Sequence, residues 1–242
     1  MSMNTLTLKN LTTLPYDVEE ALNRLRVNIG FCGKQYKKIL ITSSTPDEGK
    51  SFISVNLWRH LAEAGNRVVL VDLDLRKSVL RARYQIHSGD KDFLGVAHYL
   101  SDQAKLEDVV YETNLENAYF VPTASTVTNP TILLQSERFD SMLDQLSEEF
   151  DYVLIDTPPL ANVADGGFIA SKCDGAVLVV RSGKTPCNLI SASVKQIERS
   201  GCDLMGVVLN RTEMKNSMYY SKYAKYGYYY SSEYGKENAG RR

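Results

Sequence analysis

This sequence has few cysteines, no long apolar run and almost no net charge, and each of these absences argues against a class of protein. Its 242 residues include four cysteines, which show neither a CxxC pair nor a metal-ligand spacing, and this argues against a disulfide framework and a zinc site. No apolar run approaches the ~20 residues that span a bilayer, and residues 1–15 lack the hydrophobic region of a signal peptide. The net charge of −1 gives no global field for nucleic acid or anionic lipid. We therefore expect a cytoplasmic globular protein that binds no nucleic acid.

The stretch Ile39–Ser51 organises the rest of the chain. Its first four residues predict a buried parallel strand, and the amphipathic run Phe52–Ala64 predicts a helix. Between them, Ser44–Ser51 has the P-loop spacing, although Ser44 stands where the motif usually has its first glycine and such a string can also occur in a surface turn. A P-loop surrounds phosphates with backbone N–H groups, to which Lys50 adds a mobile charge. We therefore predict a nucleoside triphosphate site.

Two further predicted strands end in aspartates. Arg67–Asp72 runs into Asp74, so that two carboxylates separated by one residue follow a strand, and Asp151–Asp156 is a buried run that ends in Asp156. Ligands of open parallel sheets bind at the carboxyl ends of the strands. Asp156 is typical of the carboxylate that orients Mg²⁺ through its water shell. Asp72 could instead cap a following helix, but its pairing with a second aspartate favours a functional role.

The remaining periodic segments alternate between helix and strand, which predicts an α/β fold with a doubly wound, mostly parallel sheet covered by helices on both faces. Hydrophobic residues make up 43% of the chain, enough for one sizeable domain. The further elements that we expect are helices at Tyr16–Phe31 (with Asp17 as N-cap), Phe93–Leu100, Leu106–Val110, Thr131–Phe150 and Asn188–Ser200, and strands at Ala118–Val121, Gly175–Val180 and Leu204–Asn210.

Composition divides the chain into three parts. Residues 1–15 are polar and predict an extended arm, and residues 16–211 predict the α/β domain. Residues 212–242 hold almost no aliphatic side chains, yet eight of the fifteen tyrosines fall within Tyr219–Tyr234. Such a segment buries too little surface to offset its ordering entropy, so we expect a disordered tyrosine-rich tail. A low-complexity tail that stacks on RNA is the alternative.

Together these motifs resemble those of the bacterial tyrosine kinases, the cytosolic partners in capsular and exopolysaccharide synthesis. The resemblance rests on the P-loop Ser44–Ser51, the aspartate motif VVLVDLDLR at Val68–Arg76, the segment YVLIDTPP at Tyr152–Pro159, and the tyrosine-rich tail, so it covers nearly the whole chain. It implies a P-loop protein-tyrosine kinase that requires ATP and Mg²⁺ and autophosphorylates its tail in trans.

The resemblance also implies a role for each matching residue. Lys50, Asp72, Asp74 and Asp156 are the implied catalytic residues, with Asp72 accepting the proton of the tyrosine hydroxyl, while Ser51, Asp74 and Asp156 hold Mg²⁺. The implied nucleotide-binding residues are Ser44, Thr45, Pro46, Asp47, Glu48, Gly49, Lys50, Ser51 and Phe52, with Asn210 and Arg211 near the adenine. The implied phosphoacceptors are Tyr219, Tyr220, Tyr223, Tyr226, Tyr228, Tyr229, Tyr230 and Tyr234.

Partners follow from the same resemblance. It implies a separate transmembrane activator of the polysaccharide co-polymerase type, which recruits the kinase to the inner face of the membrane, and a cognate phosphotyrosine phosphatase. It also implies a homo-oligomer with Glu20 and Arg26 at the subunit interface. The family's helix motif ExxRxxRxN is incomplete here because Asn23 replaces its first arginine.

Two other functions share part of these motifs. Partitioning-type ATPases, which work as ATP-gated dimers, have the same sheet and aspartate motifs. They usually carry an extra lysine after the first P-loop position, where this chain has Thr45, and they lack a tyrosine run. A non-catalytic nucleotide-binding scaffold is disfavoured by the intact set of Lys50 and the three aspartates.

Overall fold

One eight-stranded sheet organises residues 1–210, the first of two units of the chain, the second being residues 211–242. The computed structural model describes residues 4–89, 92–161 and 165–212. The strand order is β1-β4-β5-β3-β6-β2-β7-β8, and every neighbouring pair is parallel except β4 and β5. The strands are β1 (Thr5–Leu6), β2 (Lys38–Ser43), β3 (Val68–Asp72), β4 (Tyr111–Thr113), β5 (Ala118–Val121), β6 (Tyr152–Asp156), β7 (Gly175–Arg181) and β8 (Asp203–Asn210).

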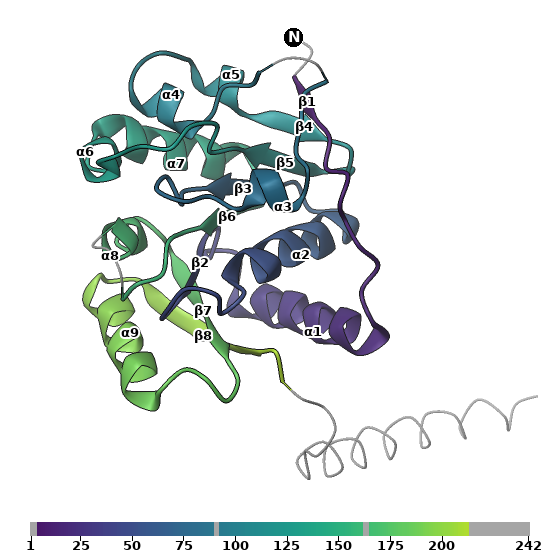
Figure 1. Cartoon of the computed structure of the whole chain (residues 1–242), viewed down its shortest axis with the longest axis vertical. Helices are drawn as coiled ribbons and strands as arrows, with labels where there is room; N and C mark the ends of the chain where they lie inside the picture. The colour runs from purple at the N-terminus through teal and green to yellow at the C-terminus, as the bar shows by residue number, and fades with distance from the viewer. Residues whose placement is uncertain (1–3, 90–91, 162–164, 213–242) are drawn as a thin grey trace, which may run out of the picture. The chain divides into compact units, whose positions relative to one another are not determined.

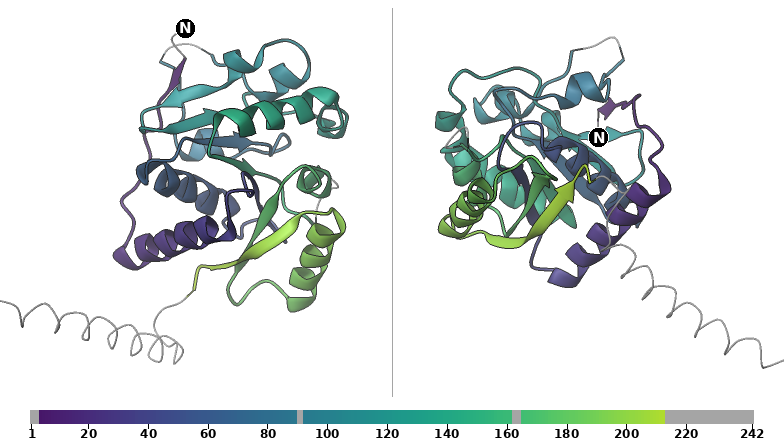
Figure 2. Two further views of the ribbon diagram at one scale, coloured as in Figure 1. Left: turned by 180° about the vertical axis from the view of Figure 1, so that it is seen from behind. Right: turned by 60° about the horizontal axis from the view of Figure 1, so that its bottom comes forward.

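Helices cover both faces of this sheet, as Figures 1 and 2 show, with α1 and α2 on one face and α7, α8 and α9 on the other. The prediction of a doubly wound, mostly parallel α/β fold is confirmed. The helices are α1 (Tyr16–Cys32), α2 (Lys50–Glu63), α3 (Leu80–Arg83), α4 (Val96–Leu100), α5 (Leu106–Val109), α6 (Pro130–Leu134), α7 (Glu137–Glu149), α8 (Asp165–Ala170) and α9 (Cys187–Arg199).

The alternation of side chains along β2 explains the two layers. Ile39 and Ile41 join the core cluster that holds the buried residues of α1 and α2, whereas Leu40 joins the cluster of α7 and α9. Successive strand residues point to opposite faces, so a central strand that is buried on both sides reads as one continuous apolar run. Trp58 of α2 is fully buried, and its indole N–H donates to the carbonyl of Val68 at 3.2 Å. This contact fixes α2, and with it the P-loop, against the sheet.

The N-terminal arm is more structured than expected. Its residues Thr5 and Leu6 form β1 beside β4, and Leu6 and Leu8 are buried in the core on the α1–α2 face. The expected N-cap of α1 is wrong: the cap position is Pro15, and Asp17 lies inside the first turn. A carboxylate there still favours the helix through the helix dipole.

Other boundaries also differ from the expected ones. The segment expected as one helix over 131–150 is two helices, α6 and α7, separated at Gln135 and Ser136. The expected helix from Phe93 begins at Val96. The described part of the chain contains no helix long and apolar enough to cross a membrane. All four cysteines lie in that part and are free thiols.

Candidate functional site

The P-loop connects β2 to α2 at the carboxyl edge of the sheet. Gly49 has φ +96°, and a Cβ there would lie 2.1 Å from the side-chain nitrogen of Asn210. That nitrogen donates to the carbonyl of Glu48 at 2.9 Å. Glycine is therefore required at position 49 both by the backbone conformation and by the close approach of β8. The structure thus brings Asn210 to the P-loop, whereas its predicted adenine contact stays a prediction.

Ser44, the departure from the usual glycine, has a definite structural setting. Its side chain is fully buried, and the hydroxyl of Ser193 on α9 donates to the hydroxyl of Ser44 at 2.9 Å. A buried hydroxyl is tolerated where it finds a hydrogen-bond partner. Ser193 was not anticipated from the sequence, because it lies 149 residues away.

Glu48 is a buried carboxylate inside the same loop. It accepts hydrogen bonds from the N–H of Thr45 at 2.8 Å, from the N–H of Arg181 at 3.4 Å and from the hydroxyl of Thr185. Pro46 and Asp47 are exposed at the tip, where Asp47 has φ +62°. Glu48 therefore ties the P-loop to the end of β7 and the turn that follows it.

Lys50 lies among the carboxylates that follow β3 and β6. Its ammonium is 3.4 Å from Asp74 Oδ2, 3.4 Å from Asp156 Oδ2 and 3.2 Å from the hydroxyl of Ser51. Burial by itself lowers the pKa of Lys50, but the charges of the nearby aspartates outweigh this and raise it above its usual value. Lys50 is thus held as a cation beside the loop that would surround the phosphates.

The oxygen atoms around Asp156 suit a hard divalent cation. Ser51 Oγ donates to Asp156 Oδ2 and Ser54 Oγ to Asp156 Oδ1, both at 2.8 Å. Hydroxyl and carboxylate oxygens are the ligands that Mg²⁺ prefers, and this ion is commonly held by one or two carboxylates together with substrate phosphates. Within residues 4–89, 92–161 and 165–212, no three His, Cys, Asp or Glu side chains form a metal site by themselves. The donors present fit Mg²⁺ that enters with a nucleotide.

Asp72 ends β3 directly opposite Asp156 in the parallel pairing and is 1% exposed. Its carboxylate accepts a hydrogen bond from the hydroxyl of Ser78, and its carbonyl accepts one from Thr123 Oγ1 at 2.7 Å. Burial raises the pKa of Asp72 from 3.8 to about 7, and the charge of Asp156 acts in the same direction, against the opposing effects of Ser78 and Lys50. A carboxylate with a pKa near neutrality can exchange a proton at physiological pH.

Several residues at this edge were not predicted. Ser54 could have been found, because it lies one turn after Ser51 on the same helix face. The guanidinium of Arg76 bonds Asp165 Oδ2 at 2.7 Å, and Thr131 donates to Asp165 Oδ1 at 2.8 Å. Arg76 therefore pairs with a buried carboxylate at this edge of the sheet.

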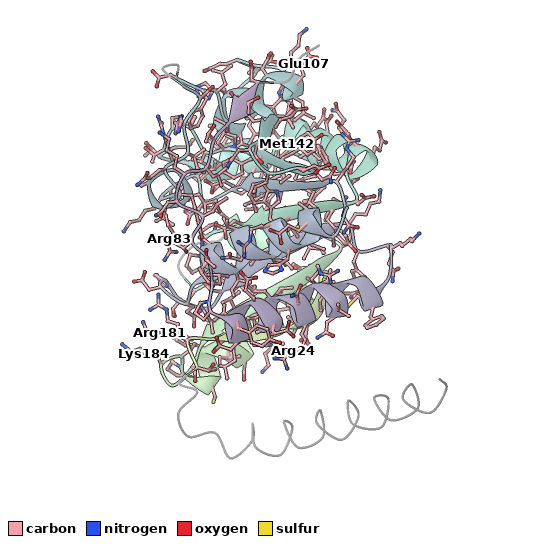
Figure 3. All side chains as sticks on the ribbon, turned by 90° about the vertical axis from the view of Figure 1, so that its right-hand side faces the viewer. Arg24, Arg83, Glu107, Met142, Arg181 and Lys184 are labelled. Carbon is pink, nitrogen blue, oxygen red and sulfur yellow. The ribbon has the colours of Figure 1, made fainter. Side chains whose placement is uncertain are left out.

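Basic side chains lie near the carboxyl ends of the strands, where the P-loop also lies. Figure 3 shows Arg83, Arg181 and Lys184 along one margin of the molecule. Arg83 lies in α3, which follows β3 in the chain. Arg181 is the last residue of β7, and Lys184 follows it in the turn that holds Thr185. Clustered cations near a phosphate cradle favour the approach of an anionic ligand.

The other predicted residues are placed as follows. Phe52 is partly buried in the first turn of α2, next to the P-loop. Glu20 and Arg26 are partly buried on α1, and their predicted interface role stays a prediction. Arg211 opens the second unit of the chain, so its contact with adenine also stays a prediction. The eight predicted phosphoacceptor tyrosines lie outside the described residues.

The chain is similar to a protein family, to a kinase sequence and to a solved kinase domain. A family model described as an AAA domain matches residues 36–199. The chain is 39% identical over 209 residues to the tyrosine-protein kinase CpsD of Streptococcus agalactiae, which covers 86% of this chain and 90% of that protein. The solved BceF tyrosine kinase domain is similar with a TM-score of 0.70 and 35% identity, over 79% of this chain and 76% of that one.

A more distant similarity is to the septum site-determining protein MinD of Pyrococcus horikoshii, solved with Mg-ADP. The TM-score is 0.62 at 24% identity, over 73% of this chain and 72% of that one. At this identity the likeness shows a shared fold.

Proposed function

This chain belongs to the bacterial tyrosine-protein kinases, and we propose that it uses Mg·ATP to phosphorylate the tyrosines of its own C-terminal segment in trans and thereby regulates capsular or exopolysaccharide synthesis and export. One observation supports the proposal above all: the Lys50 ammonium lies 3.4 Å from a carboxylate oxygen of Asp74 and 3.4 Å from one of Asp156. Asp72 lies opposite Asp156 at the same edge of the sheet. Phosphoryl transfer needs positioned charge more than covalent chemistry, and this edge supplies it.

Each residue has a definite task in this proposal. The N–H groups of the P-loop and the ammonium of Lys50 bind the ATP phosphates, and Lys50 leaves its carboxylate partners as it does so. Ser51, Asp74 and Asp156 would hold Mg²⁺, which supplies charge neutralisation for the transferring phosphoryl group. Asp72 accepts the phenolic proton, which matters because the unperturbed pKa of tyrosine is about 10.

Transfer between chains is tested by mixing two full-length variants with Mg·ATP. The donor keeps its active site but carries phenylalanine in place of all eight tyrosines of the 219–234 segment. The acceptor carries Lys50→Met and keeps its tyrosines. We expect phosphate on the tyrosines of the Lys50→Met chain, mapped by mass spectrometry.

Two controls make the result decisive. Each variant alone should yield no phosphotyrosine in this segment, and circular dichroism should show that both are folded. If the unmodified protein labels these tyrosines while the mixture does not, transfer occurs within one chain. If the unmodified protein does not label them at all, autophosphorylation of this segment is wrong.

The partners belong to the same proposal. A separate membrane protein of the polysaccharide co-polymerase type would activate the kinase at the inner face of the membrane, and a phosphotyrosine phosphatase would reset it. Subunits would associate through Glu20 and Arg26 of α1. Co-purification of this chain with its activator, compared with a Glu20→Ala, Arg26→Ala variant, tests whether assembly and activation depend on that helix.

A further inference from the structure

One ion pair joins the segments that follow two neighbouring strands of the sheet. Arg76 lies in the segment after β3, and Asp165 opens α8, which follows β6 in the chain. Arg76 Nε donates to Asp165 Oδ2 at 2.7 Å, and its Nη1 lies 3.5 Å from the carbonyl oxygen of Thr128, in the loop after β5. Thr131 of α6 donates to the other carboxylate oxygen, Asp165 Oδ1, at 2.8 Å. Segments that follow β3, β5 and β6 thus meet at one carboxylate.

The carboxylate of this pair is buried. The side chain of Asp165 is 2% exposed, whereas that of Arg76 is 37% exposed. A buried carboxylate is stable as an anion only where its oxygens are paired, and both oxygens of Asp165 have a partner. A guanidinium is planar and directs its donors along fixed lines, so its two contacts fix the orientation of the Arg76 side chain. Arg76 is therefore anchored at this edge of the sheet.

The peptide group next to Arg76 holds the carboxylate of Asp74. The N–H of Lys77 donates to Asp74 Oδ1 at 3.1 Å and to the carbonyl of Asp74 at 3.2 Å. This N–H belongs to the planar peptide bond between Arg76 and Lys77, so an anchored Arg76 fixes the direction in which the N–H points. The second oxygen, Asp74 Oδ2, lies 3.4 Å from the ammonium of Lys50. The ion pair thus reaches Asp74 through one peptide group.

The backbone of this turn has a second anchor that does not involve Arg76. Leu75 is 1% exposed, and its carbonyl accepts a hydrogen bond from the N–H of Val127 at 2.8 Å. A buried apolar side chain and a backbone hydrogen bond keep the path of the chain when a neighbouring side chain is changed. Substitution of Arg76 should therefore change the orientation of Asp74 more than the fold of the turn.

We propose that Arg76 and Asp165 are positioning residues, whose ion pair holds Asp74 in the orientation that binds Mg²⁺ together with the nucleotide. The inference rests on the proposed function, in which Asp74 helps to hold Mg²⁺. Arg76 and Asp165 touch neither nucleotide nor metal and act through Asp74 alone. Because the pair ties the segment after β3 to the segment after β6, it also keeps Asp74 and Asp156 on either side of the Lys50 ammonium.

The test measures nucleotide binding to the full-length protein by calorimetry, once with Mg·ADP and once with ADP in the presence of EDTA. The variants are Arg76→Ala, Arg76→Lys, Asp165→Asn and the double variant Arg76→Ala, Asp165→Asn. Arg199→Ala removes an exposed arginine of α9 and is the matched control. ADP without metal engages the P-loop but not Asp74, so the two titrations separate the metal site from the phosphate site.

We expect Arg76→Ala and Asp165→Asn each to raise the Kd for Mg·ADP by about tenfold, as is usual when a group that orients a metal ligand is lost. The Kd for ADP in EDTA should stay within about twofold. The double variant should bind Mg·ADP no more weakly than the weaker single variant, because both substitutions remove the same interaction. Arg76→Lys keeps the charge without the planar fork and should recover part of the loss. Arg199→Ala should change neither Kd.

An unchanged Kd for Mg·ADP in the single variants overturns the proposal. Equal losses with and without Mg²⁺ also overturn it, since the pair would then support the whole site rather than Asp74. Additive losses in the double variant would show that the two residues act separately, which overturns it as well. If circular dichroism shows that Arg76→Ala is unfolded, Arg76→Lys and Asp165→Asn make the same comparison.

The unmodified protein separates this inference from the proposed function. If it binds Mg·ADP no more tightly than ADP in EDTA, the metal site fails and the positioning role fails with it. If it binds Mg·ADP more tightly but forms no phosphotyrosine from Mg·ATP, the proposed kinase activity fails, while the effects of Arg76→Ala and Asp165→Asn on Kd still decide the positioning role.

Discussion

The ammonium of Lys50 lies between Asp74 and Asp156, and this pairing decides what a substitution at position 50 does. The sequence predicts that Lys50 binds phosphate and takes part in catalysis. In the structure it is also the counter-charge of a cluster of acidic groups at the carboxyl edge. Asp72 differs from Lys50, because burial raises its pKa and so favours its neutral form.

Lys50→Met should abolish phosphotyrosine formation and also lower stability. Removing one partner of a buried ion pair typically costs about 3–5 kcal/mol, and the partial exposure of Asp74 places the expected loss at about 1–3 kcal/mol. Thermal unfolding measures it, with Lys184→Met, an exposed lysine, as control. Millimolar Mg²⁺ should raise the Tm of Lys50→Met more than that of the unmodified protein. An equal effect of Mg²⁺ on both would mean that the carboxylates do not depend on Lys50 for neutralisation.

Asp72 should impose a pH dependence with a definite sign. Because its pKa is about 7 and only the ionised carboxylate accepts a proton, the transfer rate should rise as the pH increases through 7 and level off above it. Asp72→Asn should remove this rise along with most of the activity, and Mg·ATP binding should persist. A profile that falls through pH 7 would contradict the assignment of Asp72 as the base.

The same group should affect stability. In the unfolded chain Asp72 loses its proton near pH 3.9, whereas in the folded protein it keeps the proton until about pH 7, so its ionisation destabilises the fold progressively over that window. Asp72→Asn should therefore raise the free energy of unfolding at pH 8 by on the order of 1–4 kcal/mol and by less at pH 5. Urea unfolding at the two pH values measures the difference. An equal change at both would mean that Asp72 is already ionised at pH 5.

At the scale of elements, the strands that could be predicted, β5 and β8 among them, are those with apolar runs of about four residues or more. β2, β3, β6 and β7 are central and buried on both faces, so their sequences carry a strong signal. β1 and β4 have two and three residues, too few for any pattern, and they depend on pairing with distant segments.

Some residues of the site could also be predicted from the sequence, and others could not. Lys50, Asp74 and Asp156 could be expected at one edge because the carboxyl ends of parallel strands meet there. Ser78, Thr123 and the partners of Glu48 could not, because they lie on loops whose paths depend on tertiary packing. A serine or threonine in a loop has no spacing that distinguishes a partner from a solvated residue.

Glu48 connects the P-loop to the end of β7 and should act as a positioning residue. Glu48→Ala should raise the Kd for Mg·ATP by about tenfold, because Thr45, Arg181 and Thr185 lose their shared acceptor. Glu48→Gln keeps one acceptor oxygen and should recover most of this loss. Calorimetry measures the binding, with the exposed Glu198→Ala on α9 as control. Equal effects of alanine and glutamine would show that the charge matters rather than the hydrogen bonds.

At the scale of the whole molecule, charge is distributed unevenly along the chain. The net charge is −1, yet the segment from Arg211 onward carries seven Lys and Arg against three Asp and Glu. Each phosphate adds about −1.5 to −2 charges at pH 7. Full phosphorylation of eight tyrosines would therefore reverse the sign of this segment.

We expect this reversal to loosen any assembly of the protein. Phosphorylated tails should repel one another, so light scattering should show a smaller mass after incubation with Mg·ATP than before it. The variant with phenylalanine at all eight positions should keep its mass under the same treatment. A monomer in both states, at high concentration and with Mg·ADP, would remove the premise of an oligomer.

The two-residue strand β1 has a consequence for how the protein behaves when it is shortened. A sheet edge with unpaired backbone groups is a template for the strands of other molecules, and short edge strands blunt that hazard. β1 is the edge strand beside β4, and the side chain of its residue Leu6 is fully buried in the core. A chain trimmed to start at residue 16 would expose β4 and an apolar hollow together. Its solutions should turn cloudy on storage through edge-to-edge stacking, whereas those of the full-length chain stay clear.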